Sequence, residues 1–372
     1  MWFLVLGCVG AEVDSATPWV DPGIEGCGAE VAGGTGGERF AVTSLDDSGP
    51  GTLREALTER SFSDGELVPR EVVFEVAGTV TVDSPIEVVS GQLTVDGASA
   101  PEPGITLTKA QVEGLIVELA ASDVVLSHLR FVGTWEPGEA GVEGAGTLAV
   151  TGARDSDGVR GVVLDHLTIR DANDSAADLW GAVSDVTVSW SLFLDNRHPV
   201  SVSHHPEPFL TRDCISLHHN VFTRTGERNP QLRGDVRRAD LVENVVHGWG
   251  RTEEGRGSGV KIRAEEGEPS VEVNLVGNVL LPTERPEHAL VYGSEPGPDD
   301  DGTPSVWLED NVLPAEVVDA YATLDAPVEV PAVTRYGTDA LHEVVLPRVG
   351  TGWRDDDEAE ALLAVKSALE GG

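Results

Sequence analysis

The sequence is poor in several residue types, and each shortage narrows what the protein can be. Aromatic residues make up 5% of the 372 residues, methionine occurs once and cysteine three times. Lysine is also scarce (Lys109, Lys261 and Lys366), so nearly all positive charge is arginine. With a formal net charge of −39, the chain is not expected to bind nucleic acid, because neutralising phosphates requires Lys and Arg. Beyond the N-terminus, no apolar run approaches the roughly 18–20 residues that span a bilayer.

Glycine and valine are plentiful instead. The chain has 43 glycines, and valine recurs in short runs. This composition is typical of many short strands joined by tight turns rather than of long helices. The hydrophobic fraction of 40% indicates a globular protein, and the length allows one large core or two domains.

The N-terminus, Met1 to Cys8, is a short apolar run that ends in Leu-Gly-Cys. It resembles the tail of a bacterial lipoprotein signal, although it lacks a basic region and is shorter than usual. We expect residues 1–24 to be a leader and linker, and the protein to be secreted, with or without a lipid anchor on Cys8 at the bacterial cell surface. The sequence leaves open whether the other two cysteines, Cys27 and Cys214, form a disulfide.

A short pattern recurs along the chain: an apolar strand, a polar or His/Asn pair, then two further apolar positions. The spacings between successive anchors of this pattern are 38, 24, 29, 24, 34 and 33 residues. The shortest spacing indicates a bare coil, and the longer ones indicate coils with extruded loops, as expected for a solenoid. The anchors are Leu126, Leu164, Val188, Leu217, Leu241, Leu275 and Leu308.

An asparagine stands three residues after each of the last four anchors. Asparagine tolerates the left-handed backbone of a sharp bend, and stacked side-chain amides can hydrogen-bond along a solenoid axis. The repeat therefore predicts an all-β fold, a parallel β-helix, with four amides in one stack. These are Asn220, Asn244, Asn278 and Asn311.

Helices are expected near both ends of the solenoid. Thr52-Leu53-Arg54-Glu55 has the spacing of a capping box and predicts a short helix from Leu53 to about Arg60, covering the open end. A second helix, from about Asp356 to Leu369, carries Leu362, Val365 and Leu369 on one face and is expected to pack outside the coils or cap the far end. The predicted division is a leader (1–24), a β-helix (25–350) and a helical C-terminus (351–372).

Four motifs follow one another over roughly residues 25–280. They are Gly36 to Ala56, the stretch Val163-Leu164-Asp165-His166 followed by Asp174, the stretch Leu217-His218-His219-Asn220-Val221-Phe222, and Arg228-Asn229-Pro230-Gln231-Leu232-Arg233-Gly234. In this order they resemble the signatures of the pectate lyase family, whose Arg-x-Pro-x-x-Arg motif the last one matches. The resemblance implies a right-handed parallel β-helix that cleaves pectate, polygalacturonate or a related uronate polymer by calcium-assisted β-elimination.

The resemblance also implies roles for individual residues. Removing a uronate C5 proton requires a neutralised carboxylate, a base near C5, and positive groups that hold the developing charge. Arg228, the first arginine of the motif, would be the base, and Arg233 would bind a substrate carboxylate with its planar fork. Asp174 and Asp178 would hold the calcium ion.

Two positions depart from the family pattern. A third acidic residue, expected one coil earlier, falls near Gly146-Thr147, so Glu143 or Glu139 would have to replace it from the loop. The family's substrate-binding lysine falls at Arg197-His198, and we expect these two residues to contact the substrate instead. Asp165 and His166 are interpreted as structural.

Two other functions remain open. A β-helical glycoside hydrolase would need paired carboxylates, and its Asn-Thr-Asp and Gly-His-Gly motifs are missing, although Val260-Lys261-Ile262-Arg263 faintly resembles its basic motif. A carbohydrate-binding or cell-surface β-helix without catalysis would follow from the loss of a calcium ligand. An Arg228 beside a formed calcium site favours the enzyme, and an Arg228 turned into the core favours the binder. The expected partner is an acidic polysaccharide, and the expected state is a monomer.

Overall fold

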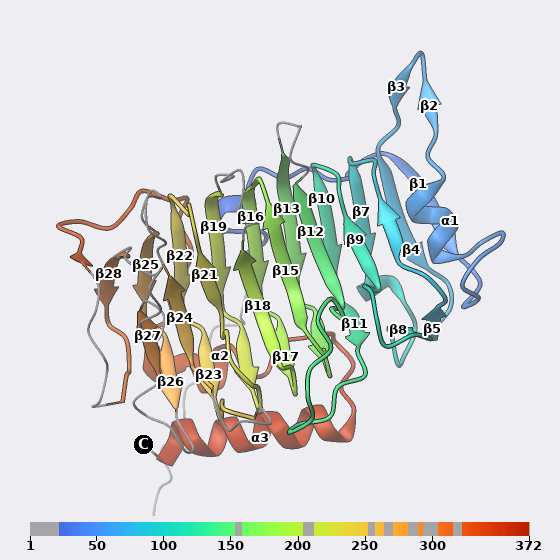
Figure 1. The fold of residues 1–372 in the computed structure, drawn as a ribbon. Helices are drawn as coiled ribbons and strands as arrows, with labels where there is room; N and C mark the ends of the chain where they lie inside the picture. Colours follow the sequence, from blue (N-terminus) through green and yellow to red (C-terminus); the bar gives the residue numbers. More distant parts are fainter. Residues whose placement is uncertain are drawn as a thin grey trace, which may run out of the picture.

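The computed structural model describes residues 22–152, 158–203, 212–251, 257–263, 271–281, 289–292, 304–314 and 322–371. Successive strands stack coil upon coil into a right-handed parallel β-helix (Figure 1). The predicted all-β fold is thereby confirmed. Residues 1–21, which include Cys8 and most of the predicted leader, lie outside the described residues. Within the described ranges, the helices are too short or too polar to cross a bilayer.

Three long parallel sheets form the walls of the solenoid. In hydrogen-bonding order, sheet 1 contains β1 (Glu38–Val42), β4 (Arg70–Phe74), β7 (Leu93–Asp96), β10 (Val124–Ser127), β13 (Val159–Asp165), β16 (Val183–Ser189), β19 (Asp213–His218), β22 (Ala239–Val242), β25 (Glu272–Val276), β28 (Ser305–Glu309) and β29 (Ala322–Thr323). Sheet 2 contains β5 (Gly78–Val82), β8 (Ile105–Lys109), β11 (Leu129–Val132), β14 (Thr168–Arg170), β17 (Leu192–Leu194), β20 (Val221–Thr223), β23 (Val245–His247) and β26 (Val279–Leu281). Sheet 3 contains β6 (Ile86–Val88), β9 (Val117–Leu119), β12 (Leu148–Gly152), β15 (Ser175–Gly181), β18 (His198–Ser203), β21 (Gln231–Arg233), β24 (Val260–Arg263) and β27 (Leu290–Tyr292). A small antiparallel hairpin, β2 (Phe62–Ser63) with β3 (Glu66–Leu67), projects from the N-terminal end (Figure 1).

The predicted anchors form one row of sheet 1. Each is the direct partner of the next, from Leu126 and Leu164 through to Leu275 and Leu308. Their side chains point into the solenoid, and all except the half-buried Leu308 are buried. The 24-residue spacings are therefore bare coils, and in the longest spacing, from Leu126 to Leu164, the additional described residues form the loop between β11 and β12.

The predicted asparagine stack is also present. The Nδ2 group of Asn220 donates to Asn244 Oδ1, Asn244 donates to Asn278, and Asn278 donates to Asn311, each over 3.0 Å. The left-handed backbone lies one residue earlier than expected, at His219 (φ 55°) and at the equivalent positions of later coils. Because the preceding residue makes the bend, the asparagine side chain can form hydrogen bonds with the neighbouring coils on both sides.

Helix α1 (Leu53–Thr58) stands at the N-terminal end of the solenoid, where Figure 1 shows it beside the first strands. Thr52 caps it by accepting from the Glu55 N–H, and Leu53 and Leu57 are buried in the core. The helix ends two residues before Arg60, because Glu59 already has an extended backbone.

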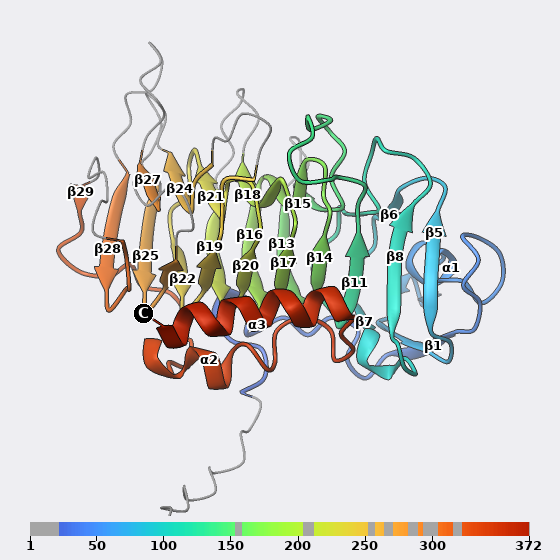
Figure 2. The ribbon, with the colours of Figure 1, turned by 90° about the horizontal axis from the view of Figure 1, so that it is seen from below.

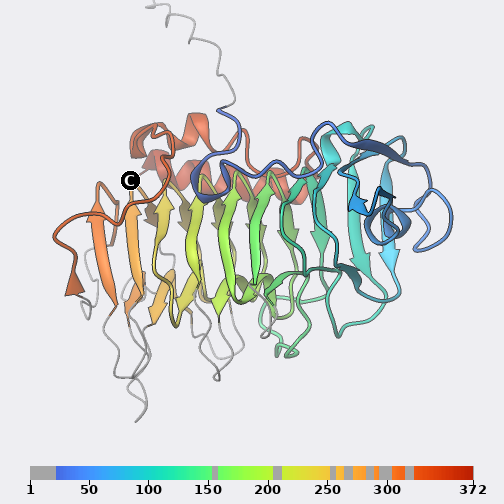
Figure 3. The same ribbon diagram turned by 90° about the horizontal axis from the view of Figure 1, so that it is seen from above.

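The N-terminal segment crosses the outer face of sheet 1 and is covalently fixed there (Figure 3). Cys27 and Cys214 form a disulfide across 187 residues, which settles the question that the sequence leaves open. The Cys27 N–H also donates to Ser216 Oγ over 3.0 Å, and the Gly34 N–H donates to Thr94 Oγ1 over 3.0 Å.

The C-terminal region runs back along the outside of the coils. Val328 forms two backbone hydrogen bonds with the Asn274 side chain, and the buried Glu243 carboxylate accepts the N–H groups of Tyr336 and Gly337. Short helices follow, a 3-10 turn (Thr338–Ala340) and α2 (Leu341–Val344). The last coil strands thus precede residue 350, the predicted end of the β-helix, because this segment bonds to side chains rather than extending a sheet.

Helix α3 (Asp356–Gly371) lies across the outside of sheet 2 (Figure 2). The three predicted face residues, Leu362, Val365 and Leu369, pack in a cluster with outward side chains of sheet 2 such as Leu192 and Val221. Of the two predicted places, outside the coils or over the far end, the helix thus takes the first.

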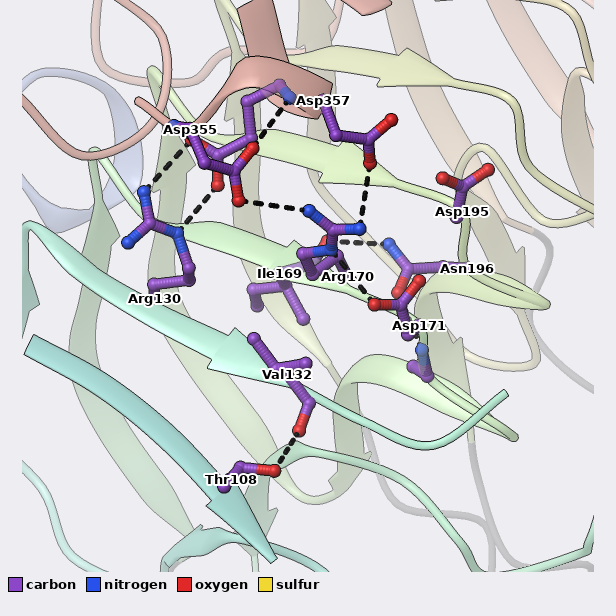
Figure 4. Close-up of polar contacts among 12 residues, drawn as sticks. Thr108, Arg130, Val132, Ile169, Arg170, Asp171, Asp195, Asn196, Asp355 and Asp357 are labelled. Carbon is purple, nitrogen blue, oxygen red and sulfur yellow. Dashed lines mark hydrogen bonds and ion pairs between the residues drawn. The ribbon is translucent and has the colours of Figure 1, made fainter. Parts of the chain in front are cut away.

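Ion pairs fix the first turn of α3 to the same sheet (Figure 4). Arg130 Nε lies 2.6 Å from Glu358 Oε1, and Arg170 Nη2 lies 2.8 Å from Asp357 Oδ2. Arg224 reaches the same Asp357 over 2.9 Å. The helix is therefore held by apolar packing along its length and by charge at its start.

A buried acid lies under the segments that cover sheet 1. Asp240 is paired in register with Ser216 and Asn274, and among the described residues its Oδ1 atom has no hydrogen-bond partner. Burial raises the pKa of Asp240 to about 7, and the hydrogen bond with Ser216 only partly opposes this effect. The folded state therefore binds this proton more tightly than the unfolded state does.

We expect Asp240→Asn to stabilise the protein as pH rises. A carboxyl with a raised folded-state pKa contributes no penalty near pH 4, and its penalty grows until about pH 7 and then levels off. Above pH 7 the variant should gain up to about 3–4 kcal/mol of unfolding free energy, measured by urea titration at a series of pH values. Asp64→Asn, at an exposed turn, is the charge-matched control. An equal gain at all pH values would refute the assignment to this proton.

Candidate active site

The outer face of sheet 3 collects most of the residues that the motifs single out. Along its strands, side chains alternate between the core and the outside, so that Leu179, Val202 and Leu232 point inward. Asp178 lies outward on β15, next to Ser201 on β18, which in turn pairs with Gln231 on β21. This alternation brings residues from separate coils onto one surface.

Arg228 lies in the turn before β21, with a left-handed backbone at φ 66°. The next residue, Asn229, fixes this turn, since it is fully buried and bonds to Thr225 and to the Ser258 carbonyl. The Arg228 side chain is 28% exposed, and its Nη1 donates to Ser201 Oγ over 3.4 Å. The guanidinium is thus fixed at the outer face rather than turned into the core.

The environment of Arg228 makes its charged form less favourable. Burial lowers the pKa of the guanidinium, and the positive charge of Arg197 lowers it further. The carboxylates of Glu227, Asp174 and Asp178 oppose this change without cancelling it. Arg228 is therefore an arginine whose proton is held less tightly than usual.

His198 connects the two sides of this site. Its ring is buried; Nδ1 lies 3.1 Å from Asp174 Oδ1, and Nε2 lies 3.3 Å from Glu227 Oε1. Both ring nitrogens are thus occupied by carboxylates of the protein. The predicted contact of His198 with substrate would require one of these bonds to be replaced.

Glu227 and Lys261 are site residues that the motif analysis does not assign. Glu227 Oε2 lies 3.3 Å from Lys261 Nζ, and Glu227 Oε1 lies 3.8 Å from Arg228 Nε. Burial raises the pKa of Glu227, but His198, Lys261 and Arg228 outweigh it and hold the pKa well below its usual range. Only their positions in the sequence could have indicated these two residues. Glu227 directly precedes Arg228, and Lys261 lies in the stretch compared above with a glycoside hydrolase motif.

Asp174 and Asp178 both lie close enough to affect the pKa of Arg228. Asp174 accepts the Gly144 N–H over 2.8 Å, and this bond with the His198 contact keeps its pKa low in spite of burial. The register places Ala149 of β12 directly beside Asp178, at a position where a third acid would face the site. Glu143, from the loop, is exposed, and the described residues contain no cluster of three metal-ligand side chains.

The remaining predicted residues lie on either side of Arg228. Arg197 packs against Gly141 of the loop that also contacts Asp174, since a side chain at Gly141 would collide with the Arg197 guanidinium. Arg233 is on β21, in register with Arg263 on β24. The surface thus combines two aspartates, an arginine of lowered pKa, and further cations one coil along. Such a surface can bind a polyanion and remove a proton from it.

Comparisons with known proteins find relatives in sequence and in fold. A protein named probable pectate lyase C from Aspergillus flavus is 30% identical over 261 residues, covering 70% of this chain and 54% of that protein. A crystal structure of pectate lyase from Bacillus sp. N165 in complex with trigalacturonate superposes with a TM-score of 0.59, at 17% identity, over 89% of this chain and 99% of that one. The chain resembles pectate lyases in both sequence and fold.

A crystal structure of the major allergen from cedar pollen superposes with a TM-score of 0.63, at 17% identity, over 88% of this chain and 93% of that one. At such low sequence identity, these structural matches show similarity of fold and nothing further. The chain spans about half the length of the curated pectate lyase relative, at 54%. No family model matches the chain.

Proposed function

We propose that the protein is a polysaccharide lyase that cleaves pectate, polygalacturonate or a related uronate polymer by β-elimination. The observation that carries this proposal is the state of Arg228, a guanidinium at the outer face of sheet 3 whose pKa is lowered by burial. When neutral, such a group can accept the C5 proton of a uronate; the C4–O bond then breaks, a C4–C5 double bond forms, and the leaving oxygen takes a proton from the guanidinium or from water. Arg233 and Arg197 are proposed to bind substrate carboxylates.

Calcium is the proposed cofactor, held by Asp174 and Asp178. Carboxylate oxygens are the ligands that calcium prefers, and it takes six to eight of them. Two aspartates fit as part of such a shell, but Ala149 supplies none, so the other oxygens would come from water and from the polysaccharide. When bound, calcium would neutralise a substrate carboxylate and make the neighbouring C5 proton more acidic. His198 would keep Asp174 oriented, because its Nδ1 atom contacts that carboxylate.

We expect the double variant Asp174→Asn/Asp178→Asn to lose a weak to moderate calcium site. Titration calorimetry measures this loss directly, and the control is an Asp64→Asn/Asp339→Asn variant, which removes two exposed charges elsewhere. The control matters because a chain with 64 acidic residues binds calcium non-specifically at its surface. Calcium uptake equal to that of the wild type in the double variant would contradict the site.

The test of the function itself is the formation of unsaturated uronate from polygalacturonate, followed by ultraviolet absorbance with and without calcium. The absence of an acid at Ala149 favours the alternative of a carbohydrate-binding β-helix without catalysis. Binding of polygalacturonate with no unsaturated product would support that alternative. A reducing end without a double bond would instead support a glycoside hydrolase.

We further propose that the protein acts outside the cell, as a monomer, on an acidic polysaccharide. The Cys27–Cys214 disulfide supports export, because such bonds persist in oxidising compartments. Lipid attachment at Cys8 remains a prediction about residues outside the described ranges, and membrane contact through it is part of the same prediction.

A further inference from the structure

The outer face of sheet 3 carries its charges in two separate halves. One outward row is aligned strictly by strand pairing, and its first part is acidic whereas its last part is neutral or basic. From β6 to β24 this row contains Glu87, Glu118, Ala149, Asp178, Ser201, Gln231 and Lys261. The acidic part of the row ends at Asp178, and the neutral or basic part begins at Ser201, the residue that Arg228 contacts.

The neighbouring outward row changes at the same place. On the first strands it is uncharged: Val89, directly after β6, is 68% exposed, and Thr151 of β12 pairs with Trp180 of β15. On the last strands it is basic, where Arg233 of β21 pairs with Arg263 of β24. In both rows, therefore, the change in charge lies between β15 and β21.

The acidic half is not explained by the needs of folding. Glu87 and Glu118 are direct neighbours on adjacent strands, about 4.8 Å apart, where like charges repel. Within the described parts of the chain, neither glutamate forms an ion pair. In the basic half, by contrast, the one acid described above, Glu227, is bonded to Lys261 and His198. In a chain of net charge −39, a local excess of cations is the unusual feature.

We propose that this face selects a uronate polymer that is only partly esterified. The inference rests on the proposed function and adds the substrate pattern to it. Units with free carboxylates bind over β21 and β24, where guanidinium forks match carboxylates. Uncharged units, methyl-esterified or neutral, bind over β6, β9 and β12, where Glu87 and Glu118 repel free carboxylates and where Val89 is exposed. Trp180, on the next strand β15, adds aromatic surface.

The test compares two polymers and two variants. Affinity electrophoresis is run in gels that contain either polygalacturonate or a partially methyl-esterified polymer of the same length, without calcium. The wild type should be retarded more strongly by the esterified polymer. Glu87→Gln/Glu118→Gln should bind polygalacturonate about fivefold more tightly than the wild type does, with little change on the esterified polymer, and added salt should reduce the difference. Glu30→Gln/Glu360→Gln, which removes two exposed charges away from sheet 3, should behave as the wild type.

Product formation is measured separately, so that two failures can be told apart. A shift in binding preference without any unsaturated product would refute the lyase function but support the selective face. Unsaturated product with no change in preference in Glu87→Gln/Glu118→Gln would overturn the proposal. A weaker binding of polygalacturonate by that variant would also overturn it, since the glutamates would then be attracting the polymer through bridging cations.

Discussion

Arg228→Lys is expected to lower the rate of β-elimination by about 10²–10⁴-fold, the usual range for a positioned proton transfer. Lysine keeps a positive charge but has a shorter reach and lacks the guanidinium plane that donates to Ser201. If Arg228 removes the proton, its position is decisive and the charge alone cannot replace it. The measurement is kcat on polygalacturonate, by absorbance of the unsaturated product.

Arg233→Lys is the matched comparison, because it makes the same chemical change in the same coil, at the end of β21 rather than in the turn before it. Arg233 is proposed to bind a carboxylate in the ground state, so its loss should mainly raise KM and leave kcat nearly unchanged. Small and equal effects of the two substitutions would make Arg228 an ordinary substrate contact. Another proton acceptor would then be required, and the lyase proposal would weaken.

Glu358→Ala is expected to destabilise the protein by about 3–5 kcal/mol, because it leaves the buried Arg130 guanidinium without its counter-charge. Glu358 is fully buried, and its two oxygens lie 2.6 and 3.0 Å from Arg130 Nε and Nη2. The same carboxylate accepts the Asp355 N–H at the start of α3. The loss should therefore appear both as a lower urea midpoint and as faster proteolysis of the C-terminal helix.

The double variant Arg130→Met/Glu358→Met separates the two possible causes. If the cost comes from an unpaired buried charge, removing both partners should restore most of the stability. If α3 is held by its apolar face alone, Glu358→Ala should have a small effect and the double variant should add nothing. Glu370→Ala, at an exposed pair with Lys366, is the control and should change stability by less than about 1 kcal/mol.

The site was predictable in part. Arg228, Arg233, Asp174 and Asp178 were identified through their resemblance to pectate lyase motifs, and the structure brings at least Arg228 and the two aspartates into one electrostatic environment. The links between them were not predictable. His198 contacts Asp174, 24 residues earlier, and Glu227, 29 residues later, because three successive coils stack at that point. Loops of unequal length between strands hide this vertical alignment in the sequence.

What the sequence determined by itself is the coil. Alternating apolar positions, a 24-residue minimum spacing and an asparagine in each of the last four coils are local patterns, and together they establish the parallel β-helix and the row from Leu126 to Leu308. Only the tertiary structure decided which segments cover the coils and how charge is distributed over their outer faces. It paired Cys27 with Cys214, laid α3 across sheet 2, and aligned Glu87 with Glu118 on one side of Arg228 and Arg233 with Arg263 on the other. These contacts join residues that are distant along the chain, and they depend on strand register, which is fixed only when all the coils stack and bury their inward side chains together.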